Sequence, residues 1–201
     1  MPFNSPGLKS SRNRLRRQLR ARRSAMTESV ASDAARACAE YLSSSGVFKD
    51  ARHVAGYACV GRELDPAPLL QIALDADKSV YLPRVKAANS MEFVAWRPGD
   101  PIRDNRFGIP EPASGKVAVI AAEDLDLVLV PLLGFDLHGN RLGFGGGFYD
   151  RAFTFRRSGN APPFLCGYAY DDQCCDELEA AEWDVKLDAV VTQSGLRFFS
   201  G

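Results

Sequence analysis

The sequence predicts an α/β protein that is built around a mostly parallel central sheet. Segments with the pattern of helices alternate along the chain with segments typical of strands, and this alternation is typical of layered α/β folds. The run LDLVLVPLLG at residues 125–134 is apolar without alternation, as expected of a parallel strand that is covered on both faces. No internal repeat, low-complexity tract or linker interrupts the 201 residues, so we expect a single domain.

Three helices are expected in the first part of the chain. Residues 10–25 are predicted to form a basic helix, and residues 1–9 before it are expected to be flexible. Thr27 can cap a second helix, which Gly46 ends. Residues 66–76 are predicted to form a third helix, because a proline at the first helical position favours a helix start.

Short segments rich in β-branched and aromatic residues are predicted to form the other strands. These segments are residues 53–60, 79–85, 91–97, 163–170, 188–192 and 196–199. Glycine and proline mark residues 98–115 as a loop, and a turn is expected at 136–140. A further helix is expected over residues 148–157.

The composition disfavours several classes of protein. Basic and acidic residues balance at 25 each, so the whole molecule has no net charge that would attract nucleic acid or an anionic membrane. The longest apolar runs are far shorter than the ~20 residues that span a bilayer. Five cysteines without CxxC spacing, and no apolar signal-peptide core, favour the cytoplasm. His53 and His138 lie far apart in the sequence, so both are expected to be structural and not zinc ligands.

The basic run RNRLRRQLRARR at residues 12–23 is a local exception to this charge balance. It holds seven arginines and no acidic residue. Three roles remain open: binding of an anionic ligand, salt-dependent binding of nucleic acid, and a mitochondrial presequence. Leu15 and Leu19 lie on one face and would pack against the protein. Because of that face, and because no aromatic residues stand among the arginines, nucleic-acid binding is disfavoured.

The segment RLGFGGGFYDR at residues 141–151 is the most unusual part of the sequence. Four of the five residues 143–147 are glycines, which allow positive φ angles and a close approach of the backbone to a ligand. The segment follows the central strand and opens a predicted helix, whose free N–H groups and positive dipole end favour a phosphate. Arg141 could add a charge-assisted contact, and Asp150 could bind a magnesium ion between phosphates. The loop is therefore a candidate phosphate site.

The spacing of these residues leaves a purely structural interpretation open. The loop matches neither GxxxxGK[ST] nor a regular GxGxxG. Its glycines could merely permit a tight turn, with Asp150 as a favourable carboxylate in the first turn of the helix. Phe144 and Phe148 could likewise belong to the core, and Asp65 could be a solvated carboxylate beside Pro66.

Residues 125–151, LDLVLVPLLGFDLHGNRLGFGGGFYDR, resemble the signature of the 5-formyltetrahydrofolate cyclo-ligase (methenyltetrahydrofolate synthetase) family. The basic run, GRELD at 61–65, FGIPEP at 107–112 and DVKLDAVVT at 184–192 support the resemblance in chain order. It implies a three-layer α/β sandwich and an enzyme that converts 5-formyltetrahydrofolate and ATP to 5,10-methenyltetrahydrofolate, ADP and phosphate, with Mg²⁺. The formyl oxygen is phosphorylated on the way. A sugar-phosphate isomerase or a CoA transferase, the rival phosphate-binding enzymes, would leave FGIPEP and DVKLD unexplained.

The resemblance also implies roles for individual residues. Nucleotide binding falls on Arg12, Arg16, Arg141, Leu142, Gly143, Gly145, Gly146, Gly147, Phe148 and Tyr149. Folate binding falls on Val60, Asp65, Phe144, Phe148 and Tyr149. Metal binding falls on Asp150 and Asp184, and the implied catalytic residues are Arg141 and Asp150. We expect a monomer that uses ATP as co-substrate and has no nucleic-acid or membrane partner.

The loop departs from the family pattern at two positions. Some members carry arginine and lysine where this chain has Phe144 and Gly146. Two cations that would bind phosphate are therefore missing. We expect their charge to be supplied by the other arginines near the loop: Arg12, Arg16, Arg141 and Arg151.

Overall fold

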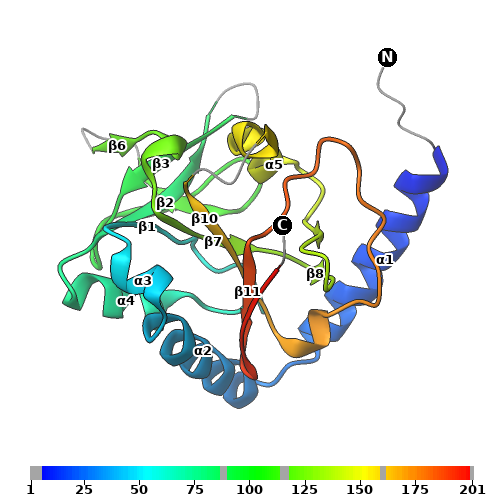
Figure 1. The fold of residues 1–201 in the computed structure, drawn as a ribbon, viewed down its shortest axis with the longest axis horizontal. Helices are drawn as coiled ribbons and strands as arrows, with labels where there is room; N and C mark the ends of the chain where they lie inside the picture. The colour runs from blue at the N-terminus through cyan, green and yellow to red at the C-terminus, as the bar shows by residue number, and fades with distance from the viewer. Residues whose placement is uncertain (1–5, 87–89, 114–117, 159–161, 200–201) are drawn as a thin grey trace.

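The computed structural model describes residues 6–86, 90–113, 118–158 and 162–199, and its centre is one large sheet (Figure 1). The strands of this sheet lie in the order β12-β11-β10-β7-β1-β2-β3-β6. The inner strands, from β11 to β2, pair in parallel, and the outer strands pair antiparallel. The predicted α/β class and mostly parallel sheet are confirmed.

The helices and strands that the sequence predicts occur in the predicted order, and α3, β4, β5, β6 and β9 are additional. The helices are α1 (Pro6–Ser24), α2 (Glu28–Ser43), α3 (Gly46–Asp50), α4 (Ala67–Asp75) and α5 (Phe148–Ala152). The large sheet is formed by β1 (His53–Ala55), β2 (Ser79–Val85), β3 (Met91–Ala95), β6 (Val119–Ile120), β7 (Leu127–Pro131), β10 (Phe164–Tyr168), β11 (Ala189–Thr192) and β12 (Gly195–Phe198). Two small hairpins are β4 (Ile102–Asp104) with β5 (Pro110–Pro112), and β8 (Gly134–Phe135) with β9 (Arg141–Leu142). Short 3₁₀ helices are η2 (Ala122–Asp124), η3 (Thr154–Ser158) and η4 (Asp171–Gln173).

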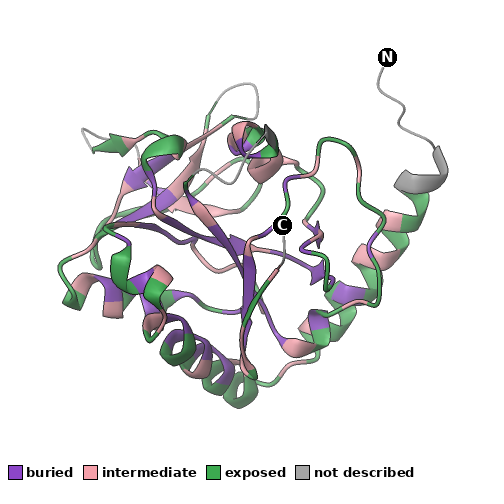
Figure 2. Cartoon of the chain, viewed as in Figure 1, coloured by how far each residue is buried: buried purple, intermediate pink, exposed green. Residues whose placement is uncertain are grey.

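Strand β7 is covered on both faces, which explains its unbroken apolar sequence. Leu127 and Leu129 pack in a cluster with residues of α2, α3 and α4. Val128 and Val130 belong to the cluster on the opposite face, which includes residues of α5 and η3. Because successive side chains of a strand point to opposite faces, both sets must be apolar here. Figure 2 shows buried residues concentrated in the strands between these two coverings.

Helix α1 lies beside the β8–β9 hairpin and stands apart from the helices that cover the large sheet (Figure 1). Its apolar face packs on a small cluster formed by Leu15, Leu19, Leu133, Leu142 and Leu178. The predicted packing face of the basic helix is confirmed, and the helix is part of the folded protein. Residues 6–9 of the segment expected to be flexible belong to this helix, whereas residues 1–5 lie outside the described residues.

Several predicted elements are shorter in the structure. The helix expected over 148–157 ends after α5, because Phe153 leaves helical geometry and buries its side chain in the core. The strand expected over 53–60 is only β1. The run 125–134 divides at Pro131, which lacks the N–H that would continue the ladder, into β7 and β8.

Two predictions about element boundaries need correction. The second helix ends at Ser43, close to the predicted boundary, but Gly46 does not stop it. Gly46 begins α3, and the hydroxyl of Ser45 caps this helix by accepting the N–H of Phe48 at 3.2 Å. The segment 98–115, expected to be a loop, contains the β4–β5 hairpin within its described residues. Prolines and glycines therefore mark the ends of these elements and do not exclude them.

Candidate active site

The β8–β9 hairpin follows β7 in the chain and leads into the glycine-rich loop, which ends at helix α5. Its turn is held by the buried Asp136, whose carboxylate accepts the N–H groups of His138 at 2.9 Å and Asn140 at 3.0 Å. Burial disfavours the charge, but hydrogen bonds from Asn140, His138 and Leu178 outweigh it and hold the pKa of Asp136 below its ordinary value. The predicted turn at 136–140 is confirmed, and it fixes the start of the loop.

Two glycines of the loop have backbone conformations that other residues rarely adopt. Gly145 has a φ of 104° and Gly147 a φ of 64°. A Cβ atom on Gly147 would also lie 2.8 Å from a guanidinium nitrogen of Arg151. The fold therefore needs glycine at both positions. Since α5 has only five residues, its dipole is a weaker attraction for an anion than the predicted longer helix would be.

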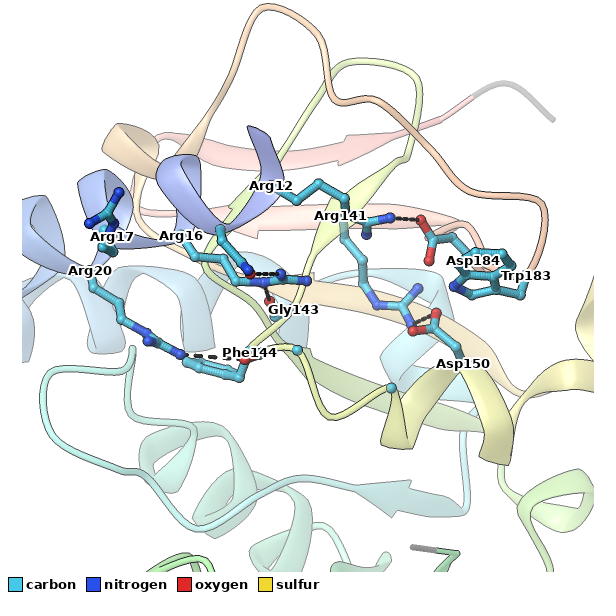
Figure 3. A pocket seen from close by; sticks show the side chains of 13 residues that line it. Arg12, Arg16, Arg17, Arg20, Arg141, Gly143, Phe144, Asp150, Trp183 and Asp184 are labelled. Atoms are coloured by element: carbon cyan, nitrogen blue, oxygen red, sulfur yellow. Dashed lines mark hydrogen bonds and ion pairs between the residues drawn. The ribbon is translucent and has the colours of Figure 1, made fainter. Parts of the chain in front are cut away.

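A cavity of about 550 Å³ opens between α1 and the loop, and we call it the cationic cavity. The arginines that line it are Arg12, Arg16, Arg17, Arg20 and Arg141 (Figure 3). Arg16 is held against the loop, because its Nε donates to the carbonyl oxygen of Gly143 at 2.9 Å. Burial, together with the charges of Arg12 and Arg20, lowers the pKa of Arg16. Positive groups crowded in this way favour the binding of a polyanion.

An ion pair joins the two ends of the loop. The buried Arg141 donates to Asp150 Oδ1 at 2.6 Å and also to the carbonyl oxygen of Val185. Asp150 Oδ1 in turn accepts the N–H of Val185 at 3.2 Å. The two predicted catalytic residues are thus in contact, and a second pair, Arg12 with Asp184 at 2.9 Å, lines the same cavity (Figure 3).

The two predicted metal ligands, Asp150 and Asp184, both line the cationic cavity. Each accepts a bond from an arginine, and within the described residues no group of three or more His, Cys, Asp or Glu side chains converges. Mg²⁺ binds through one or two carboxylates together with substrate phosphates and water. The residues therefore fit a magnesium ion that is bound jointly with a nucleotide.

A second cavity, of about 370 Å³, borders the loop, and we call it the apolar cavity. Most of its lining is apolar, including Val60, Pro83, Ile109, Pro131 and Phe148. The hydroxyl of Tyr149, which also lines it, is buried and has no hydrogen-bond partner among the described residues. Because a buried polar group without a partner is costly, this hydroxyl is ready for a ligand group. The cavity suits a flat ligand with polar edges.

The glycine-rich loop is the wall between the two cavities. Arg141, Gly143, Phe144, Gly147 and Asp150 line both of them. A ligand in the cationic cavity and a ligand in the apolar cavity would therefore meet across the same short stretch of chain. This arrangement suits the transfer of a group from a polyanion to an apolar partner.

The structure places the predicted folate contact Asp65 outside the apolar cavity. Asp65 is exposed and lines an adjoining cavity, and its Oδ1 accepts the N–H of Ala67 at 2.9 Å. Glu63, in the same GRELD segment, lines the apolar cavity. Its Oε2 accepts the N–H of Val60 at 2.9 Å, and its Oε1 pairs with Arg23 at 3.4 Å. Glu63 could not be selected from the sequence, because nothing in the sequence distinguishes the two carboxylates of this segment.

The fold and the two cavities define an α/β protein whose site suits a phosphate-bearing ligand beside a flat, mostly apolar one. Comparison with known proteins specifies the family. The model of the 5-formyltetrahydrofolate cyclo-ligase family matches residues 8–193. The 5-formyltetrahydrofolate cyclo-ligase of Escherichia coli (strain K12) is 35% identical over 178 residues, which cover 88% of this chain and 97% of that protein. This chain belongs to the 5-formyltetrahydrofolate cyclo-ligase family, whose members are ligases of folate one-carbon metabolism.

Solved structures agree with this assignment. The NMR structure of Aquifex aeolicus 5,10-methenyltetrahydrofolate synthetase matches with a TM-score of 0.79 and 29% identity, covering 94% of this chain and 93% of that one. A 5,10-methenyltetrahydrofolate synthetase from Mycoplasma pneumoniae matches with a TM-score of 0.72 and covers 90% and 98%, but at 22% identity it shows the fold alone. None of the helices in the described ranges has the length and apolar character to span a membrane.

Proposed function

We propose that this enzyme catalyses the ATP- and Mg²⁺-dependent cyclisation of 5-formyltetrahydrofolate to 5,10-methenyltetrahydrofolate, with release of ADP and phosphate. The observation that carries the proposal is the loop that forms one wall of both cavities. Family membership supports the choice of reaction and the use of ATP. The cationic cavity then receives the triphosphate, and the apolar cavity receives the pterin.

The chemistry of the substrate explains why ATP is needed. Nitrogen donates electrons into the formamide carbonyl, so its carbon is a poor electrophile and its oxygen a poor leaving group. Transfer of the γ-phosphoryl group to the formyl oxygen releases ADP and makes that oxygen part of a phosphate. The neighbouring folate nitrogen then attacks the carbon, loses its proton, and phosphate departs. Phosphoryl transfer needs mainly positioning and charge stabilisation from the protein, so no nucleophilic Ser, Cys or His is required.

The cationic cavity supplies the charge for the phosphates. We assign Arg12, Arg16 and Arg141 to phosphate binding, together with the loop residues Gly143, Gly145 and Gly147, which line this cavity. Leu142 is instead buried in the cluster under α1, and Gly146 lines the apolar cavity. Arg141 is preorganised by its bonds to Val185 and Asp150, which lowers the cost of holding it against a transferring phosphoryl group. Arg20, which lines both cavities, joins this set. Arg151 is folded back on the loop, where it donates to the carbonyl oxygen of Gly146 at 2.7 Å.

The apolar cavity is assigned to the folate. Phe144, Phe148 and Val60 contribute apolar surface for the flat pterin, and the hydroxyl of Tyr149 offers a polar contact. Glu63 supplies the carboxylate that accepts N–H groups of the ligand, a role that the resemblance alone gives to Asp65. Glu63 suits this role because it lies within the cavity.

Asp150 and Asp184 are assigned to Mg²⁺, together with the nucleotide phosphates. The ion would supply neutralisation of the phosphate charge. A monomeric state and a cytoplasmic location remain predictions. The location is consistent with five cysteines that are all free in the structure.

An absorbance assay tests the proposed reaction. Purified enzyme with ATP, Mg²⁺ and 5-formyltetrahydrofolate should generate the near-ultraviolet absorbance of the methenyl product, and reactions without ATP should not. Circular dichroism of the same sample establishes that the protein is folded. Folded enzyme that produces no absorbance change with all three components would contradict the proposed function.

A further inference from the structure

Arg23 makes contacts that differ from those of the other arginines of α1. It lies near the end of the helix and lines the apolar cavity. Its guanidinium pairs with Glu63 Oε1 at 3.4 Å, and the side chains of both residues are nearly buried, with exposures of 11% and 8%. The guanidinium also lies over the ring of Phe144, 5.2 Å from the ring centroid. One side chain therefore connects α1, the GRELD segment and the glycine-rich loop.

The charge of Glu63 depends on this contact. Burial raises the pKa of Glu63, whereas the hydrogen bond from the N–H of Val60 and the charge of Arg23 act in the opposite direction. The other titratable groups around Glu63 come from several elements: Tyr57, Cys59, Tyr149 and Tyr170. Burial raises the pKa of each of them, to about 12 for Cys59 and Tyr170. They are therefore neutral at physiological pH, and Arg23 is the charged side chain that contacts the carboxylate.

We propose that Arg23 is a positioning residue of the folate site, which holds Glu63 as an ionised acceptor and the ring of Phe144 as a wall of the apolar cavity. The inference rests on the proposed function, because it takes 5-formyltetrahydrofolate as the ligand. An ionised carboxylate has about four acceptor positions, and the bonds from Val60 and Arg23 leave positions free. The ring N–H and the amino group of a pterin are adjacent donors that can bind to them. Arg23 acts through Glu63 and Phe144 and need not contact the folate.

The charge on Glu63 makes a pH-dependent test possible. Folate binding needs the ionised carboxylate, so affinity should fall as the pH drops through the pKa of Glu63. Arg23→Gln removes a charge that lowers this pKa, so the loss of affinity should begin at a higher pH. An adjacent opposite charge lowers a carboxyl pKa by about 1–3, so the midpoint should move upward by roughly one pH unit or more.

The experiment measures equilibrium binding of 5-formyltetrahydrofolate, without ATP, from mildly acidic to mildly basic pH. Arg23→Lys keeps the charge and should bind with a midpoint close to that of the wild type. Arg22→Gln is the matched control, since it removes the same charge from the neighbouring exposed position on α1. Thermal unfolding of each variant shows whether it is folded.

Three results would overturn the inference. The first is a midpoint in folded Arg23→Gln equal to that of the wild type and of Arg22→Gln. The second is an Arg23→Lys midpoint displaced as far as that of Arg23→Gln. The third result can be obtained even if Arg23→Gln does not fold. Glu63→Gln should bind the folate weakly, and its affinity should not change with pH around the wild-type midpoint. A midpoint that persists in Glu63→Gln would assign the titration to another group. Folded wild-type enzyme that neither binds nor converts the folate would instead contradict the proposed function itself.

Discussion

Replacing Asp150 with asparagine tests the proposed metal site, because the change removes a charge and keeps an oxygen in place. Asp150 Oδ1 accepts hydrogen bonds from Arg141 at 2.6 Å and from the N–H of Val185 at 3.2 Å. The amide oxygen of asparagine can accept both bonds. The variant should therefore fold with the loop in place but bind Mg²⁺ poorly, since the ion favours charged oxygen ligands.

The burial of the ion pair sets the expected loss of stability. The side chain of Arg141 is 6% exposed and that of Asp150 is 22% exposed. Asp150→Asn keeps an acceptor for Arg141, so we expect a loss of about 1–2 kcal/mol, which corresponds to roughly 2–8 °C in Tm for a chain of this length. Asp150→Ala leaves the buried guanidinium without this acceptor, and we expect a loss of about 3 kcal/mol or more, or at least roughly 6–12 °C.

The assay is the Mg²⁺ dependence of kcat/KM for ATP, measured beside thermal unfolding. Asp188→Asn is a closely matched control, because Asp188 pairs with the buried Arg156 at the same distance, 2.6 Å, with side-chain exposures of 22% and 5%. This control should lose similar stability and keep the wild-type Mg²⁺ dependence, whereas Asp150→Asn should require more Mg²⁺. An unchanged Mg²⁺ requirement in folded Asp150→Asn, or an equal change in both variants, would remove Asp150 from the metal site.

Four further substitutions test the assignment of residues to the two cavities. Asp184→Asn should weaken Mg²⁺-ATP binding in calorimetry and leave folate affinity nearly unchanged, because Asp184 lines the cationic cavity; an equal loss for both ligands contradicts this. Glu63→Gln should raise the folate KM roughly 10-fold or more by loss of a charged acceptor, while Asp65→Asn should have little effect. The opposite order of effects would assign the folate contact to Asp65. Gly145→Ala should weaken ATP binding, since φ is 104° and the new Cβ would lie 3.6 Å from the Arg16 guanidinium; wild-type ATP affinity would show that the loop tolerates it.

The sheet could be predicted because its strands have a strong sequence signal. Residues 127–130 alternate between the two core clusters, so an unbroken apolar run was sufficient to identify a strand covered on both faces. The helix expected over 148–157 could not be bounded in the same way. Its sequence continues to favour a helix, but burial of Phe153 in the core ends α5 early. Tertiary packing therefore decides where this helix stops.

Some site residues could likewise be predicted from local sequence chemistry, whereas others are identified only by tertiary contacts. The glycines and Arg141 could be selected from the sequence, since a phosphate loop needs residues of these types close together. The seven arginines of the basic run look alike in the sequence, and only the packing of α1 directs Arg20 and Arg23 toward the loop and the apolar cavity. The choice between Glu63 and Asp65 likewise depends on how the chain turns after β1.

Helix α1 links the two cavities through the wall that they share. Arg16 and Arg20 donate to the carbonyl oxygens of Gly143 and Phe144, at 2.9 Å and 3.4 Å, and so help to hold the loop. Burial lowers the pKa of Arg16, and the positive charges of Arg12 and Arg20 lower it further, so these arginines repel one another unless an anion lies between them. If the sites are as proposed, a bound triphosphate would relieve that repulsion and would favour the arrangement of α1 and the loop in which the loop lines the apolar cavity. Because coupling between two binding sites is reciprocal, a folate that binds best to this arrangement would then also strengthen the binding of ATP.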